Sequence, residues 1–378
     1  MSVPRNPSRR RCLAASTVFL SGCWKKPKPG FSGYAFVANE EGYAIAAVDL
    51  SAFAVVRHIH LEAAPTQLIS HSARQMVYAL TPATGVVHEI SRAKLARERA
   101  GPLGGAVLDI RLSSGGEAIW ALMRDAKQLV ELPLDTLRPA RRIALPQLAS
   151  GFDLSLEQPR AMVSFGPAGA AGVVDLQSGK VRMTDCGSPI GTAIFRKDGL
   201  QCIAPHRDKK LLTVLDTVSG RVVVRLPLAM RPDHLCYNSN KGQLFVTGQG
   251  SDAVAIVFPY RTEVAETVLS GSSPAAMAAS PLSLDSPEFL FVTNPRSNQV
   301  TILDIENRKV VAVAQVGAEP SHVTITPNNQ YALVLNQRSG DMAVIRIEAT
   351  AKRSRFPAAL FTMIPVGSKP VTAVVQAV

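Results

Sequence analysis

Short apolar runs recur along the chain from Tyr34 onward, and Gly, Asn, Asp, Ser or Pro separates each run from the next. The runs are rich in Val, Ile, Leu and aromatic residues, which is typical of antiparallel strands joined by tight turns. In the clearest period, four strands are expected at residues 289–293, 299–304, 310–315 and 322–326. No window keeps apolar residues three and four apart for long enough to predict a substantial helix.

This four-strand pattern repeats at intervals of 41 to 46 residues over nearly the whole chain. The equivalent units begin at Tyr34, Met76, Ala118, Arg160, Gln201, Gln243, Phe289 and Tyr331. A period of this length with four strands predicts an all-β fold, a β-propeller of four-stranded antiparallel blades. Eight units imply eight blades, with seven as the alternative if one of the weakest units, those at Met76 and Ala118, forms no blade.

The two ends of the repeat region fit a closed ring. It starts with the first strand of a unit, residues 34–38, and finishes with the last strand of another, residues 370–375. The last strand can complete the sheet that begins at Tyr34, so the terminal strands are expected to pair and close the ring. Residues 34–378 are therefore predicted to be a single β-propeller domain.

The first 33 residues have a different character. A basic stretch with Arg5 and Arg9 to Arg11, a short apolar run and Leu20-Ser-Gly-Cys23 predict a signal peptide over residues 1–22. Its ending resembles the bacterial lipobox, so Cys23 is the expected lipidation site. Residues 23–33, which are rich in Pro and Lys, would then be a tether. Export would follow the general secretory route or, since Ser8-Arg-Arg-Arg-Cys-Leu13 resembles a twin-arginine signal, the Tat route.

Composition and charge narrow the classes of partner. The chain is 47% hydrophobic and 19% charged, and its formal charge of +12 falls to +8 without the four arginines of the signal peptide. No basic run is interleaved with aromatic residues, so no nucleic acid is expected as a partner. We expect a monomer that is held to a membrane by its N-terminal lipid, faces the periplasm or cell exterior, and binds an envelope protein, a glycan or a small ligand.

The repeat motif resembles a known family. Phe291-Val-Thr-Asn294, Val300-Thr-Ile-Leu-Asp304 and Val316-Gly-Ala-Glu-Pro-Ser-His-Val323 are similar to the YVTN repeats of YncE-like bacterial propellers, with weaker copies across residues 34–378. The resemblance implies a propeller of the cell envelope, and it specifies the fold better than the function. Related propellers include lactone hydrolases and the eight-bladed haem-binding domains of periplasmic nitrite reductases.

The repeats also predict where chemistry would lie. The strand that follows the Pro should line the central channel, and its first residues form one aligned column: Gln67, Asp109, Asp153, Thr192, His234, Ala276, His322 and Thr372. Seven of the eight are polar. The next position is apolar throughout: Leu68, Ile110, Leu154, Ala193, Leu235, Met277, Val323 and Ala373. The alternation predicts a polar ring at the channel mouth.

The ring admits two interpretations. It is a candidate ligand site, in which His234, His322, Asp109 and Asp153 could bind a divalent metal or transfer protons. Alternatively, polar residues gather there because a channel mouth is wet. Of the other candidate residues, Cys186, Cys202 and Cys236 form no metal-binding motif. Cys202 and Cys236 lie in apolar strand contexts and are expected to be buried free thiols, with a disulfide as the alternative in an oxidising compartment. The aspartates Asp49, Asp175, Asp216 and Asp304 recur at one place in the repeat, which indicates a turn role.

Three functions follow from these observations. The first is an envelope lipoprotein whose propeller binds a partner without catalysis and without a cofactor. The second is a metal-dependent, lactonase-like hydrolase at the channel mouth, although the ring contains no Glu. The third is a propeller that binds haem or another redox cofactor, which the eight units, the two ring histidines and the possible Tat signal favour.

Overall fold

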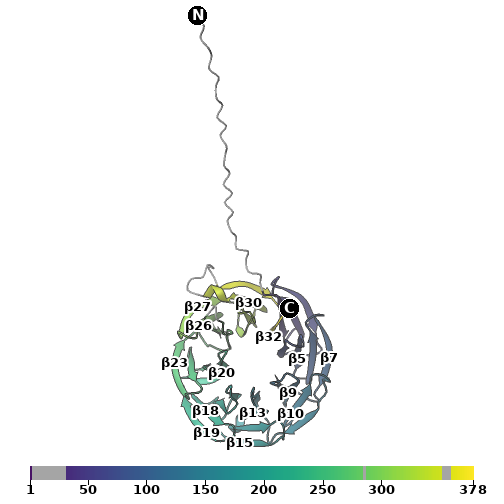
Figure 1. Cartoon of the computed structure of the whole chain (residues 1–378), viewed down its shortest axis with the longest axis vertical. Coiled ribbons are helices and arrows are strands. Elements are labelled where there is room, and N and C mark those ends of the chain that lie inside the picture. Colours follow the sequence, from purple (N-terminus) through teal and green to yellow (C-terminus); the bar gives the residue numbers. More distant parts are fainter. Residues whose placement is uncertain (2–30, 284–286, 351–358) are drawn as a thin grey trace.

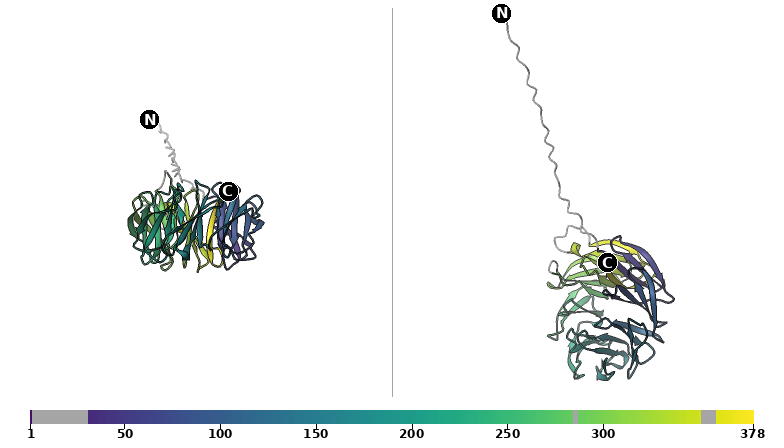
Figure 2. Two further views of the ribbon diagram at one scale, coloured as in Figure 1. Left: turned by 90° about the horizontal axis from the view of Figure 1, so that it is seen from below. Right: turned by 45° about the vertical axis from the view of Figure 1, so that its right-hand side comes forward.

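The computed structural model describes Met1 and residues 31–283, 287–350 and 359–378. The signal peptide, Cys23 and most of the expected tether lie outside the described residues. Eight four-stranded antiparallel sheets stand around a central channel and form a flat ring (Figures 1 and 2). The prediction of an eight-bladed propeller is therefore confirmed, and the weak units at Met76 and Ala118 each supply strands to a complete blade.

Each blade has the same four positions from the channel outward. The innermost strands are β4 (Gln67–His71), β8 (Val107–Leu112), β12 (Gly151–Leu154), β16 (Ile194–Phe195), β20 (Arg231–Tyr237), β24 (Met277–Ala279), β28 (Pro320–Ile325) and β32 (Pro370–Ala377). The second strands are β1 (Gly33–Asn39), β5 (Met76–Thr81), β9 (Ala118–Met123), β13 (Arg160–Phe165), β17 (Gln201–Pro205), β21 (Leu244–Gln249), β25 (Phe289–Asn294) and β29 (Tyr331–Asn336).

The outer half of each blade follows the same plan. The third strands are β2 (Ala44–Asp49), β6 (Val86–Ser91), β10 (Gln128–Pro133), β14 (Ala170–Asp175), β18 (Leu211–Asp216), β22 (Ala253–Phe258), β26 (Gln299–Asp304) and β30 (Asp341–Arg346). The outermost strands are β3 (Ala54–His60), β7 (Ala96–Pro102), β11 (Arg141–Ala144), β15 (Val181–Asp185), β19 (Val222–Pro227), β23 (Glu263–Leu269), β27 (Lys309–Gln315) and β31 (Leu360–Pro365). Two short 3₁₀ turns, Gly166–Ala168 and Ile347–Thr350, are the helical elements of the described residues.

Burial explains the composition of the strands. The second and third strands of a blade are covered on both faces by the neighbouring blades, so they are apolar almost throughout; β9 has six buried residues in a row. The outermost strands have solvent on one side and are mostly exposed; in β23 two exposed residues alternate with one half-buried residue. The core is therefore a series of layers between blades rather than one central cluster.

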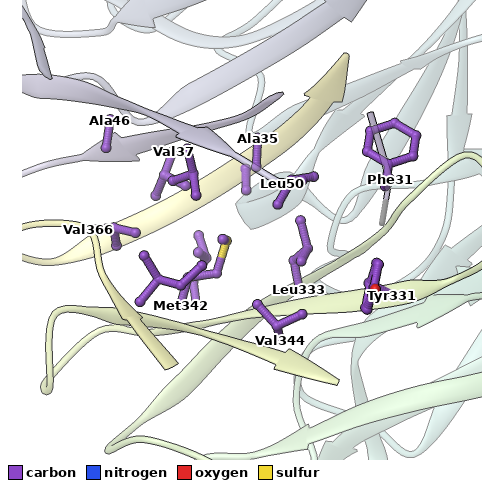
Figure 3. Close-up of a cluster of buried hydrophobic side chains, with 14 residues drawn as sticks. Phe31, Ala35, Val37, Ala46, Leu50, Tyr331, Leu333, Met342, Val344 and Val366 are labelled. Carbon is purple, nitrogen blue, oxygen red and sulfur yellow. The ribbon is translucent and has the colours of Figure 1, made fainter. Parts of the chain in front are cut away.

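The ring closes where the two ends of the chain meet. Strand β32, from the C-terminus, pairs with β1 from Gly33–Ala377 to Asn39–Pro370, and so it supplies the innermost strand of blade 1. Phe31, Ala35, Leu50, Tyr331 and Met342 pack in the layer between this blade and blade 8, which contains β28 to β31 (Figure 3). The predicted pairing of the terminal strands is confirmed.

The strand order gives the two faces of the disc different contents. Each blade has four strands, so the chain returns to the same face for every blade-to-blade connection. We call this the ring face, because the innermost strands begin there with the polar column that starts at Gln67. The opposite face, the terminal face, has the turns that follow the innermost strands and also the two ends of the propeller, where the Val378 N–H donates to the Ser32 carbonyl over 3.0 Å.

Candidate functional site: the channel mouth

The structure places one residue of the predicted column in or just before each innermost strand. Six of the eight lie within their strands, while Ala276 immediately precedes β24 and Thr192 lies two residues before the start of β16. His234 is exposed and the other seven are half-buried. The following position is buried in six blades, from Leu68 to Ala373, and half-buried at Leu235 and Met277.

Simple alternation along these strands was an incomplete prediction. In β8, β20 and β28 the pairing with the second strand skips one residue just before the ring position, for example between Pro232 and His234. A β-bulge of this kind bends the strand and re-aims the side chain that follows it. The burial pattern of β28 consequently repeats every third residue, with Pro320 and Val323 buried and two half-buried residues after each.

Two ring residues connect neighbouring blades through hydrogen bonds. The Gln67 amide donates from Nε2 to the Ile110 carbonyl over 2.9 Å and accepts at Oε1 from the Ile110 N–H over 3.0 Å. Asp153 Oδ2 accepts from the backbone N–H of Phe195, in the next blade, over 2.9 Å. These side chains satisfy backbone groups that no strand pairing reaches, so they have a role in joining the blades.

His322 makes a similar contact. Its Nε2 lies 3.3 Å from the carbonyl oxygen of Ala373 on β32, the next innermost strand. Since a carbonyl only accepts, this nitrogen carries the proton. Burial lowers the pKa of His322, while the Ala373 carbonyl opposes that shift. The neutral imidazole is therefore favoured, and its Nε2–H donates to the carbonyl of the neighbouring blade.

The two carboxylates lie on adjacent innermost strands. Asp109 forms an ion pair with Arg111 of the same strand over 3.0 Å. Burial raises the pKa of Asp109, and the nearby charge of Asp153 adds to the rise, whereas Arg111 opposes it. Burial also raises the pKa of Asp153, against the hydrogen bond from Phe195. Both groups therefore hold protons more readily than an exposed aspartate.

His234 is the ring side chain that stays available. Its imidazole has no hydrogen-bond partner within the described part of the chain, and it faces the mouth as an exposed group. Reduced access of bulk water lowers its pKa, Arg207 lowers it further, and Asp233 opposes the shift. A neutral, accessible imidazole is a good donor to a ligand.

The four candidate metal ligands do not converge. Asp109 and Asp153 are neighbours, but His234 and His322 lie in blades 6 and 8, with all of blade 7 (β24 to β27) between them. Across residues 31–283, 287–350 and 359–378, no three His, Cys, Asp or Glu side chains lie close enough together to hold a metal ion.

A buried polar cluster near this face was not predicted as a unit. His206 is fully buried and spans Ser188, whose Oγ is 2.6 Å from Nδ1, and Thr213, whose Oγ1 is 2.7 Å from Nε2. The same repeat position holds Asn294, which donates to Thr301 over 2.9 Å. The sequence signal was the alignment of His206 with the Asn of the repeat motif, and the shared contact identifies an architectural role.

The repeated aspartates and the thiols take the expected structural roles. In the turns after the third strands, Asp216 accepts from the Ser219 N–H over 2.6 Å, and these turn hydrogen bonds lower its pKa. Asp49, Asp175 and Asp304 cap the equivalent turns. Cys186 and Cys202 are buried free thiols in one apolar layer, and Cys236 is a partly buried free thiol.

Comparison with known proteins gives structural matches but none from the sequence. No protein-family model matches the chain. No curated protein matches it either. The resemblance to the YVTN repeats therefore rests on the motifs alone.

Several solved structures are similar in three dimensions. The dihydro-heme d1 dehydrogenase NirN, solved in complex with DHE, superposes with a TM-score of 0.75 at 13% identity, over 90% of this chain and 74% of that one. AztD from Citrobacter koseri, solved in the apo form, superposes with a TM-score of 0.68 at 14% identity, over 91% of this chain and 98% of that one. Kuenenia stuttgartiensis hydrazine synthase superposes with a TM-score of 0.59 at 16% identity, over 75% of this chain and 95% of that one. The likeness is one of fold.

Proposed function

We propose that this protein is a lipid-anchored protein of the bacterial cell envelope, whose propeller binds a partner or a small ligand at the ring face without catalysing a reaction. The observation that carries the proposal is the use of the ring side chains. Gln67, Asp153 and His322 direct polar atoms to the backbone of neighbouring blades. That arrangement supports a rigid, polar mouth suited to recognition.

The binding surface centres on His234 and on the ion pair of Asp109 with Arg111. His234 is exposed, and Asp109 and Arg111 form a half-buried ion pair of the channel wall. The imidazole of His234 and the Asp109–Arg111 pair lie three blades apart on the rim, and each of them can donate or accept hydrogen bonds to a polar ligand. A ligand with both hydrogen-bond donors and acceptors fits this set better than a bare ion.

The proposed anchor rests on the sequence of the first 23 residues, with Cys23 as the modified residue. The described residues contain no helix with the length and apolar character needed to cross a bilayer. Phe31, eight residues after Cys23, lies at the terminal face. A lipid on Cys23 would therefore leave the channel mouth on the side away from its attachment.

A haem-like or redox cofactor is a second candidate. It is favoured by the likeness to NirN, which is a likeness of fold, and by His234. The exposed imidazole of His234 fits the role of a ligand to iron, and such a cofactor would supply electron-transfer chemistry. His322 fits less well, because its Nε2 faces the Ala373 carbonyl. The hydrolase alternative has less support, since among the described residues no third His, Cys, Asp or Glu lies close enough to Asp109 and Asp153 to share a metal ion with them.

Two measurements test the proposal. The first is fractionation of cells that express the full chain or its Cys23→Ala variant; we expect the wild type in the membrane fraction and the variant outside it. The second is native mass spectrometry of the tagged chain, purified from envelopes, beside an Asp109→Asn/His234→Ala variant. A bound mass in the wild type that the variant lacks supports binding at the mouth, and equal spectra contradict it.

A further inference from the structure

Exposed apolar side chains gather on one sector of the terminal face. Four of them lie in turns of blade 4 (β12 to β15), blade 5 (β16 to β19) and blade 6 (β20 to β23) and are between 47% and 53% exposed. We call these four residues the tip patch: Leu156, Leu200, Val218 and Tyr260. Leu282, in a turn of blade 7, extends this sector. On the ring face the exposed large apolar residues are Tyr43, Leu148 and Leu269, which lie in widely separated blades.

The tip patch is continuous. Leu200 and Tyr260 line one hollow of about 410 Å³ with Glu157, Gln158, Lys197 and Asp198. Leu156 directly precedes Glu157 in the turn that forms one wall. Val218 belongs to the turn whose Thr217 N–H donates to the Leu200 carbonyl over 2.9 Å. Clusters of exposed apolar residues mark interaction surfaces more often than single ones do.

Local contacts hold these turns in place. The Arg196 guanidinium lies 4.1 Å from the centre of the Tyr260 ring and pairs with Asp198 over 2.7 Å. It also donates to the Pro259 carbonyl over 3.5 Å. Because these turns are already ordered, the apolar tips can dock with little further loss of side-chain freedom.

Basic residues accompany the apolar tips. Lys197 lies in the Leu200 turn, Arg221 follows the Val218 turn, and Arg261 is next to Tyr260. The acidic groups nearby are Glu157, Asp216 in the Val218 turn, Asp198 in its pair with Arg196, and Glu263, which lies 3.7 Å from Arg261. Apolar side chains beside basic ones are found on protein surfaces that lie in the interface of a bilayer, and since acidic groups balance the charge here, the apolar tips would supply the contact.

The proposed lipid anchor identifies the occupant. Seven residues lie between Cys23 and Phe31, and the eight Cα-to-Cα steps from one to the other span at most about 28 Å when fully extended. Phe31 lies on the same face as the tip patch, in the layer between blades 8 and 1, across the ring from blades 4 to 6. We propose that the tip patch rests on the lipid surface as a second point of contact, so that the disc lies flat and presents the channel mouth away from the bilayer. This proposal rests on the proposed lipid anchor.

The test uses the full-length lipidated chain in vesicles of phosphatidylethanolamine and phosphatidylglycerol. Bimane is attached to Leu156→Cys or Leu200→Cys, and the matched control is Leu148→Cys, which is equally exposed but on the ring face. The parent chain measures background labelling of the native cysteines. Interfacial side chains lie about 5–10 Å deep, so lipids with a doxyl group near the carbonyl report contact.

We expect bimane at 156 and 200 to shift to the blue and lose fluorescence with doxyl lipid, and bimane at 148 to do neither. A wild-type chain that is firmly bound to vesicles, with water-like emission at 156 and 200, overturns the tip-patch contact and leaves the anchor intact. A chain whose binding is the same with Cys23→Ala overturns the anchor instead. A blue shift that depends on protein concentration and resists doxyl lipid shows that a second copy covers the patch, which also overturns the proposal.

Discussion

Gln67 bridges two blades through a pair of hydrogen bonds with the backbone of Ile110, one donated over 2.9 Å and one accepted over 3.0 Å. Gln67 lies on β4 and Ile110 on β8, and these strands belong to two separate sheets. This amide therefore forms a direct polar link between the two sheets. The link lies where the channel opens. One side chain therefore both lines the mouth and stabilises the ring.

Replacing Gln67 tests this dual role. Gln67→Ala removes both hydrogen bonds, and because each contributes about 1 kcal/mol, we expect the free energy of unfolding to fall by about 2 kcal/mol. Urea denaturation measures the change. The control Gln177→Ala, at an exposed turn position whose side chain makes no such bridge, should stay within about 0.5 kcal/mol of wild type. Equal stabilities of the two variants would contradict the role.

Histidine burial predicts how stability depends on pH. Burial lowers the pKa of His206 below its model-peptide value of 6.5, against Asp208 and with the help of Lys209 and Arg225. The unfolded chain therefore takes up the proton first. The contribution of the neutral His206 to the stability of the folded state is complete above about pH 6.5. It is lost as the pH falls through the lower pKa that His206 has in the folded chain.

We expect His206→Asn to fold, because Asn294 makes the equivalent contact in blade 7. The variant should lose less stability than wild type between about pH 7 and pH 5. His88, His234 and His322 have the same direction of pKa shift and therefore keep part of the wild-type slope. Thermal unfolding across this pH range measures the change. If stability falls with pH by the same amount in wild type and in His206→Asn, His206 is not the source of the pH dependence.

Gly248 controls the bulge that positions His234. A Cβ on Gly248 would lie 1.8 Å from the Arg231 carbonyl oxygen, so Gly248→Ala must displace strand β20 near Pro232. We expect a loss of about 1–3 kcal/mol in stability and an altered chemical shift and pKa of His234 by NMR. Gly42→Ala, where the nearest atom is 3.4 Å from the added Cβ, is the control and should leave both unchanged.

The terminal strand should be essential for cooperative folding. Removing residues 370–378 deletes β32 and leaves blade 1 without its innermost strand. We expect the truncated chain to lose its cooperative thermal transition and to aggregate, since the edge of β1 becomes exposed. Removing Val378 alone should retain the transition, because it deletes one backbone hydrogen bond to Ser32. A cooperative transition in the longer deletion would show that the ring does not require closure.

Periodicity was enough to predict the architecture. The unit starts at Met76, Ala118, Arg160 and Tyr331 coincide with the starts of β5, β9, β13 and β29. Such agreement arises because every blade buries the same strands against its neighbours, so each repeat carries the same pattern of apolar residues and turns. The terminal pairing followed for the same reason.

The channel mouth was less accessible to prediction. Alignment gave the ring positions, but whether Asp153 faces a ligand or the Phe195 N–H depends on the spacing between blades, which no repeat encodes. The bulge before His234 also lay outside the pattern, because one extra residue changes direction without changing composition. His206 matched the Asn of the motif, yet its burial depended on Ser188, from a connection whose path the sequence did not predict.

The most direct test of the account is the metal and chromophore content of the full-length chain, purified from envelopes without chelator, beside His234→Ala. We predict no stoichiometric metal and no Soret band in either protein, which would agree with a mouth built for recognition. Stoichiometric metal, or a Soret band that disappears in His234→Ala, would contradict a non-catalytic binding propeller and establish the channel mouth as a cofactor site.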